Sequence, residues 1–159
     1  MTTTFDELVG QLDYSMFIVT ATADGERSGC LVGFASQTSI APPRFLVCLS
    51  RNNRTYRVAR GSDALAVHFV SADASALAEL FGGQTGDETD KFARCAWHEG
   101  PEGLPVLDDC GNWFAGCVLA ELDLGDHVGF LLDPIEAHAQ PGPQFPFHRA
   151  KRIDPGHPA

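Results

Sequence analysis

The sequence lacks any apolar run close to the roughly 20 residues that a membrane-spanning helix needs. Its start, Met1-Thr2-Thr3-Thr4, has neither the basic patch nor the apolar core of a signal peptide, so nothing indicates export. Basic residues are also few, since 11 Lys and Arg stand against 21 Asp and Glu in a chain of 159 residues. This acidity argues against nucleic acid or an anionic membrane surface as the main partner. We expect a single cytoplasmic domain over residues 1–159.

Cysteines at metal-binding spacing are absent as well, because no two of the five form a C-x-x-C pattern and their number is odd. This disfavours a disulfide framework and a zinc site, so no metal site is predicted. Cys30, Cys48 and Cys117 lie inside apolar runs, where a thiol usually packs as a small hydrophobic group.

One long stretch contains no carboxylate at all. Between Glu26 and Asp63 the charged residues are six arginines, namely Arg27, Arg44, Arg51, Arg54, Arg57 and Arg60. A local positive field on an acidic protein favours an anionic partner. The alternative is that the last three, which recur at helical spacing, form a solvated helix face.

The same stretch predicts a strand followed by a short helix. Residues 44–49 are an apolar run with β-branched and aromatic members, bounded by Pro42-Pro43 before and polar residues after, which is typical of a buried strand. The polar residues 50–55 are suited to a helix start, and Gly61 to its end.

The start of that helix is a candidate phosphate site. Free N–H groups, the nearby Arg51 and the side chains of Ser50, Asn53 and Thr55 are all hydrogen-bond donors to phosphate oxygens. The alternative is that these side chains only cap the helix. Upstream, the residues after Val32 become small and polar over 33–39, which lets a ligand approach the backbone.

The remaining pattern is mostly that of strands. We expect strands over 15–22, 64–70, 112–124 and 128–132, and an Asp24-Gly25 hairpin turn. His68, inside the second of these, is expected to be a hydrogen-bonded core or edge residue. Short helices are expected after Asp73 and around Lys91. An amphipathic first helix is expected to be capped by Thr4. It is expected to pack through an apolar face that consists of Phe5, Leu8, Val9 and Leu12.

The run GCLVGFASQTSIAPPRFLVCLS, followed by Asn53-Arg54-Thr55, resembles the flavin reductase-like proteins of the FMN-binding split-barrel class. The resemblance continues through Lys91-Phe92 and through Gly125-Asp126-His127, which matches a motif of that family. It implies a mostly β protein, an antiparallel Greek-key split β-barrel that closes with about six strands and carries short helices outside. It also implies a homodimer with the flavin at the subunit interface.

The resemblance further implies an NAD(P)H-dependent flavin reductase. Hydride would pass from NADH or NADPH to FMN, or to FAD, and the reduced flavin would serve a monooxygenase or another acceptor. The alternatives are a flavin-binding electron carrier without its own nicotinamide site, and a partner-binding barrel with an empty pocket.

Site residues follow from the same resemblance. Around the flavin ring we expect Gly33, Phe34, Ala35, Ser36, Gln37 and Thr38, and around its phosphate Ser50, Arg51, Asn53 and Thr55. Lys91 is either a second phosphate contact or a solvated lysine. His127 is expected beside the flavin and nicotinamide as the catalytic residue, against the alternative of an ordinary turn histidine. Residues 149–159 are expected to form a flexible tail.

Overall fold

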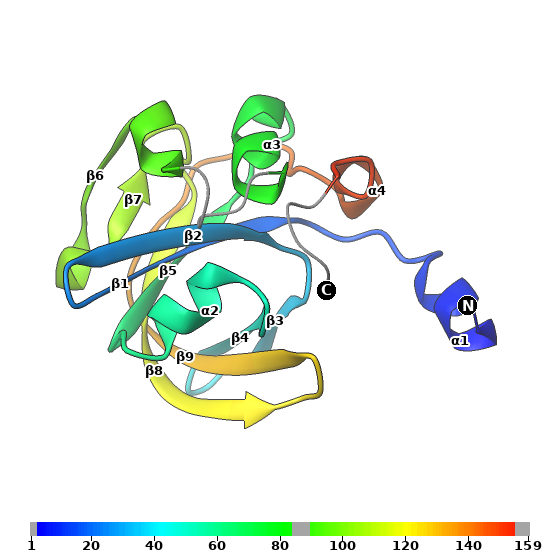
Figure 1. The fold of residues 1–159 in the computed structure, drawn as a ribbon, viewed down its shortest axis with the longest axis horizontal. Helices are drawn as coiled ribbons and strands as arrows, with labels where there is room; N and C mark the ends of the chain where they lie inside the picture. The colour runs from blue at the N-terminus through cyan, green and yellow to red at the C-terminus, as the bar shows by residue number, and fades with distance from the viewer. Residues whose placement is uncertain (1–2, 84–89, 155–159) are drawn as a thin grey trace.

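The computed structural model describes residues 3–83 and 90–154, and it is built mostly from β-strands (Figure 1). Its strands are β1 (Phe17–Ala23), β2 (Glu26–Val32), β3 (Ala35–Ser39), β4 (Arg44–Ser50), β5 (Ala64–Phe69), β6 (Trp97–Glu99), β7 (Pro105–Leu107), β8 (Trp113–Asp123) and β9 (His127–His138). Its helices are α1 (Thr4–Val9), α2 (Arg54–Ala59), α3 (Ser75–Gly83) and α4 (Phe147–Ala150), with 3-10 turns η1 (Lys91–Arg94) and η2 (Pro101–Gly103).

Seven strands form one antiparallel sheet in the order β2-β1-β5-β8-β9-β4-β3, and β6 and β7 pair separately. The expected closed barrel of about six strands is wrong in two respects. The strand count is higher, and within residues 3–83 and 90–154 no ladder joins the two edge strands, β2 and β3. The sheet curls instead, because β2 and β4 pack their apolar residues into one common core.

Local sequence signals account for the first hairpin and for the start of α2. Asp24 and Gly25 both have positive φ, 53° and 78°, as the predicted tight turn between β1 and β2 requires. Asn53 caps α2, since its side chain accepts a hydrogen bond from the Thr55 N–H at 2.8 Å. The helix ends at Ala59 with Arg60 as its C-cap, just before the Gly61 expected at that end.

Two apolar layers lie on opposite faces of the curled sheet. The inner layer gathers side chains of β1, β2, β4, β5, β8 and β9 around the buried face of α2, which lies inside the curl in Figure 1. The outer layer lies beneath α3 and α4 and includes Phe81, Phe92, Leu107 and Phe145. The short elements therefore cover the sheet where its outer face is apolar.

His68 lies in the middle of the sheet and is fully buried. Its Nδ1 is 2.9 Å from the Ile18 carbonyl oxygen, and its Nε2 accepts a hydrogen bond from the Leu107 N–H at 3.0 Å. Since Nε2 is an acceptor, Nδ1 carries the proton and donates, and the ring is neutral. The expectation of a hydrogen-bonded core histidine is confirmed.

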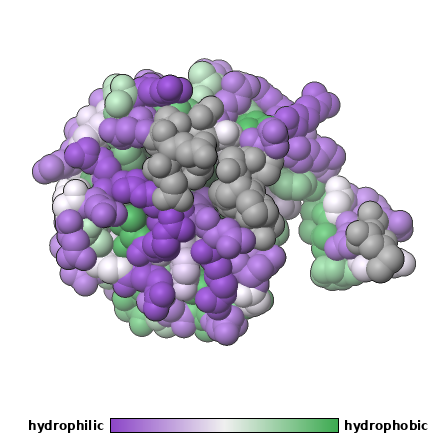
Figure 2. Space-filling model, in the orientation of Figure 1, coloured by the Kyte–Doolittle hydropathy of each residue, from purple (hydrophilic) through white to green (hydrophobic). Residues whose placement is uncertain are grey.

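The first helix does not pack as expected. Its capping box begins one residue earlier, at Thr3, whose side chain pairs with that of Asp6. None of its residues is buried, and Phe5, Leu8 and Leu12 are 68%, 59% and 56% exposed. In Figures 1 and 2, α1 stands apart from the body of the molecule as a separate lobe. Its apolar face is thus uncovered by the described residues of its own chain.

None of the helices in the described residues is both long and apolar enough to cross a membrane.

Candidate functional site

A cavity of about 380 Å³ opens between the ends of β2 and β4, the C-terminal end of α3 and the segment around α4. Five residues expected at the site line it, namely Gly33, Phe34, Ser50, Asn53 and His127. The other lining residues are Tyr14, Met16, Cys30, Leu31, Val32, Cys48, Leu49, Phe81, Gly82, Phe147, Ala150, Lys151 and Ile153. The cavity therefore has mostly apolar walls and a few polar groups, as small-molecule sites usually do.

Two glycines allow the walls to come close together. A Cβ atom on Gly82 would lie 2.7 Å from Cδ2 of Leu31, and one on Gly33 would lie 3.1 Å from Cε2 of Tyr14. Both distances are too short for an ordinary side chain without movement of its neighbour. The absence of a side chain on Gly82 therefore lets the C-terminal end of α3 pack against the end of β2.

Polar groups gather at the β4 and β9 side of the cavity. Ser50 and His127 are paired residues in the ladder of β4 and β9, so their positions are set by the sheet. Asn53 follows on the loop into α2, where its backbone N–H donates to the Ser50 carbonyl at 3.0 Å. Ser50 and Asn53 are close in the sequence, and the register of β4 and β9 brings the distant His127 to the same cavity edge.

His127 is held by its neighbour in the turn. Its Nδ1 lies 2.7 Å from a carboxylate oxygen of Asp126, and this hydrogen bond lowers the pKa of Asp126 from its usual value. An ionised carboxylate can only accept, so Nδ1 carries a proton. The Phe34 ring lies 5.0 Å from the imidazole, centroid to centroid, on the same side of the cavity. The ring nitrogen left for a ligand is Nε2.

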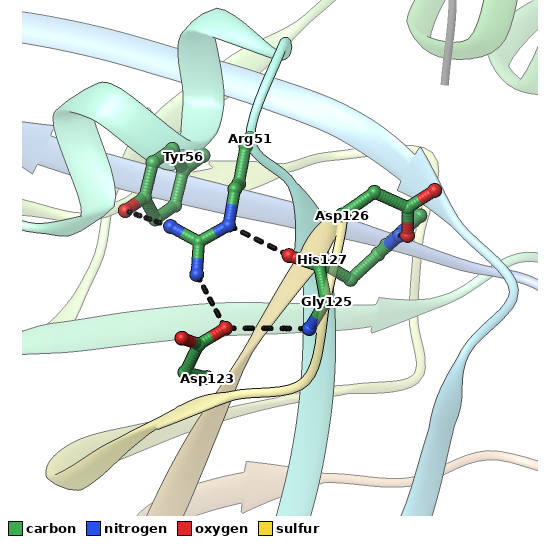
Figure 3. A network of polar contacts seen from close by, with 6 residues as sticks. All are labelled: Arg51, Tyr56, Asp123, Gly125, Asp126 and His127. Carbon is green, nitrogen blue, oxygen red and sulfur yellow. Dashed lines mark hydrogen bonds and ion pairs between the residues drawn. The ribbon is translucent and has the colours of Figure 1, made fainter.

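Arg51 is not among the residues that line the cavity. Its polar contacts are drawn in Figure 3. Its Nε donates to the Gly125 carbonyl at 2.8 Å, and its terminal nitrogens contact the Asp123 carboxylate at 2.7 Å and the Tyr56 hydroxyl at 3.4 Å. The guanidinium is thus directed at the turn between β8 and β9. This differs from the phosphate contact expected from the sequence.

Thr55 and Lys91 are buried away from the cavity. The Thr55 hydroxyl is 2.8 Å from that of Ser28. The Lys91 ammonium donates to the carbonyls of Gly29 and Phe81, both at 3.0 Å, and burial lowers its pKa. Lys91 therefore neither lies on a solvated face nor reaches the cavity. Its two hydrogen bonds connect α3 to β2.

The other expected ring contacts belong to the edge strand β3. Ala35, Ser36, Gln37 and Thr38 do not line the cavity, and the Ser36 and Gln37 side chains bond to backbone carbonyls of their own strand. The chain turns away from the cavity directly after Phe34, whose carbonyl accepts from the Cys48 N–H at 2.9 Å.

The C-terminal segment supplies residues that the sequence did not indicate. Phe147 stacks on Tyr14 with ring centroids 4.6 Å apart, and both rings line the cavity with Lys151. Residues 149–159 were expected as a flexible tail; of these, Ala150, Lys151 and Ile153 line the cavity, and residues 155–159 lie outside the described residues. The only sequence signal for this closure was the aromatic pair Phe145 and Phe147 after a Pro-Gly-Pro break.

Neither thiols nor metal ligands stand out at the site. All five cysteines are free, and burial raises the pKa of the two that line the cavity, Cys30 and Cys48, so both are neutral wall groups. Among the residues that the structure describes, no group of three or more His, Cys, Asp or Glu is placed to hold a metal ion.

Comparisons with known proteins agree with this architecture. The chain is 27% identical over 123 residues to the FMN reductase (NADH) RutF of Ancylobacter novellus, covering 77% of this chain and 67% of that protein. It is 28% identical over 147 residues to the reductase component of a 4-nitrophenol monooxygenase of Rhodococcus opacus, covering 92% and 77%.

The structure is also similar to that of the NADH:FAD oxidoreductase of Streptomyces globisporus C-1027. The TM-score is 0.79 at 22% identity, covering 86% of this chain and 82% of that one. At this identity the likeness shows the fold alone. Finally, the model of the flavin reductase like domain matches residues 9–152, and the chain belongs to that family.

Proposed function

We propose that this protein is an NAD(P)H-dependent flavin reductase, which passes hydride from a nicotinamide nucleotide to FMN or FAD and supplies reduced flavin to a monooxygenase. The observation that carries the proposal is the cavity, whose apolar walls end in a polar edge formed by Ser50, Asn53 and His127 in a flavin reductase-like domain. The relatives named as NADH-dependent FMN reductase and as a monooxygenase reductase component support the same reaction.

The residues of the cavity suit a flavin. An isoalloxazine ring is flat and largely apolar on its faces, and it would pack between side chains such as Leu31, Leu49 and Phe81. The hydroxyl of Ser50 and the imidazole of His127 would meet the polar rim of the ring. Lys151 is the cationic side chain that lines the cavity, and we assign it, in place of Arg51, Thr55 and Lys91, to the flavin phosphate.

Bound flavin supplies the hydride chemistry, so the protein needs to bind, orient and exclude water more than it needs an acid or a base. Phe34 and His127 lie at one side of the cavity, where the nicotinamide would enter. The Nδ1–H bond to Asp126 fixes the plane of the imidazole and keeps Nε2 for the ligand. The stacked rings of Tyr14 and Phe147 form another part of the cavity wall.

Stopped-flow absorbance is the direct test of this proposal. Mixing the anaerobic protein and oxidised flavin with NADH or NADPH is expected to bleach the flavin band, because hydride enters the ring bound in the cavity. Flavin binding is measured separately by fluorescence titration. Binding without reduction by either nucleotide would instead support an electron carrier, and absence of binding at about millimolar flavin, far weaker than cofactor sites normally bind, would remove both functions.

We further propose that the protein is a homodimer in which α1 packs on a second copy of the chain. A six-residue helix is unstable alone in water, and the apolar side chains of α1 are uncovered in its own chain. Burying Phe5, Leu8 and Leu12 on a partner would stabilise both the helix and the dimer. Figure 2 shows how far this lobe stands from the body.

The double variant F5E/L8E tests the dimer. Because two carboxylates cannot be buried in an apolar contact without a large cost, we expect the variant to sediment as a monomer where the wild type is a dimer. The variant Gln11→Glu adds one charge to the same segment outside the apolar set and should leave the dimer intact. A wild-type chain that sediments as a monomer at about 100 μM, a concentration at which most specific dimers persist, would contradict the proposal.

A further inference from the structure

The turn that carries His127 needs an external support. It runs from Asp123 to His127, and Gly125 at its centre has φ of 122°, a region open mainly to glycine. Glycine gives the turn this conformation but does not restrict it to one. Within the turn, Leu124 N–H donates to the His127 carbonyl at 3.1 Å, and Gly125 N–H to the Asp123 carboxylate at 3.3 Å.

Arg51 supplies that support from the neighbouring strand end. Its backbone N–H donates to the Asp126 carbonyl at 3.0 Å, and its side chain contacts the Gly125 carbonyl and the Asp123 carboxylate. Three residues of one five-residue turn are therefore held by a single arginine. The opposite end of the guanidinium rests against Tyr56 of α2, with the ring centroid 5.9 Å away.

These contacts contribute little to stability. The Asp123 side chain is 80% exposed and that of Arg51 is 40% exposed, and solvent screens the attraction between exposed charges. What the arrangement provides is geometry, because the planar guanidinium has donors in fixed directions that match several acceptors at once. Figure 3 shows the guanidinium between Tyr56 of α2 and its two acceptors in the turn, the Gly125 carbonyl and the Asp123 carboxylate.

We propose that Arg51 is a positioning residue, which braces the turn between β8 and β9 and so sets the place of His127 at the cavity. This inference rests on the proposed function, in which His127 lies beside the reacting rings. It assigns Arg51 to the nicotinamide-dependent step instead of to flavin phosphate binding. A misplacement of a reacting group by about 1 Å can lower the reaction rate about a hundredfold, even where the contact that positions it contributes little to the stability of the fold.

The variants Arg51→Met, Arg51→Lys and Asp123→Ala test the brace, because Asp123 shares it but does not line the cavity. We expect all three to lower the kcat of flavin reduction about tenfold and to leave the flavin Kd within about twofold. The double variant R51M/D123A should have the same kcat as R51M, since both changes remove the same contact between Arg51 and the turn. Arg60→Met is the matched control, because Arg60 also stacks on Tyr56, at 5.7 Å, and lies at the far end of α2.

The opposite pattern would overturn the inference. If Arg51 gripped the phosphate, R51M would weaken flavin binding, R51K would restore it, and D123A would behave as wild type. Amide hydrogen exchange of Leu124 and Gly125 in the flavin-free protein is the second measurement, and R51M should accelerate it roughly tenfold while R60M leaves it unchanged. Unchanged exchange in R51M would also overturn the brace. A wild type that reduces no flavin, by contrast, would be a failure of the proposed function.

Discussion

Acidification from neutral pH to about pH 4 is expected to lower the free energy of unfolding by about 3 kcal/mol through one imidazole, His68. Burial lowers the pKa of His68 from 6.5 to about 4 in the folded protein. Between these two values the unfolded chain binds a proton that the folded chain does not. Stability is therefore fully present above pH 6.5 and is lost as the pH falls through this window.

Chemical denaturation across this pH range measures the effect. Protonation would place a second donor on Nε2 against the Leu107 N–H, which already donates to that atom, so the folded state resists the charge. The variant His68→Gln removes the titration, and its stability should be lower at neutral pH but flatter through the window. An NMR titration in which the His68 ring protonates near pH 6.5 would contradict the burial argument.

His127→Ala is expected to slow reduction of bound flavin by NADH about a hundredfold, a loss of the size that poor positioning of reacting groups causes. The imidazole lines the cavity, and its Nδ1 is held by Asp126, so little motion is needed to present Nε2 to a ligand. Flavin affinity should change only a few-fold, because the apolar walls and the other polar groups remain. Single-turnover stopped-flow with NADH, beside a flavin titration, separates the two quantities.

The matched control is His138→Ala at the other end of the same strand, β9. His138 stacks on Trp113, with ring centroids 4.6 Å apart, and does not line the cavity. This variant should reduce flavin at the wild-type rate. A wild-type rate in His127→Ala itself would leave His127 as an ordinary turn histidine and would contradict its role in the reaction.

Short-range patterns predicted many of the elements. The apolar run 44–49 corresponds to β4, the Asp24-Gly25 pair forms the first hairpin, and the polar residues after β4 include Asn53, the cap of α2. Each of these depends on neighbours within a few residues, which is the range over which backbone preference and capping act. The family resemblance rested on the stretch from Gly29 to Thr55 and on the motifs at Lys91-Phe92 and at Gly125-Asp126-His127, and the domain match confirms it.

Long polar side chains were placed less well. The Lys91 ammonium bonds to Gly29, which is 62 residues away in the chain, and the Arg51 guanidinium bonds to Asp123, which is 72 residues away. Nothing in the residues next to Lys91 or Arg51 indicates these partners. A flexible cationic side chain takes whichever acceptors the folded sheet brings within reach, so its role depends on packing between distant segments.

The curvature of the sheet and the borders of the cavity also depend on packing between segments that are far apart in the chain. Alternating apolar residues identify strands, but they do not give the ladder order β2-β1-β5-β8-β9-β4-β3, in which β2 and β3 are unpaired edges among the residues that the structure describes. The cavity takes walls from residues as far apart as Tyr14, Phe81 and Phe147, and a pairing of two of these rings closes one side. Local periodicity thus specifies many of the elements and the motif resemblance indicates the family, while burial between segments far apart in the chain selects which side chains line the cavity.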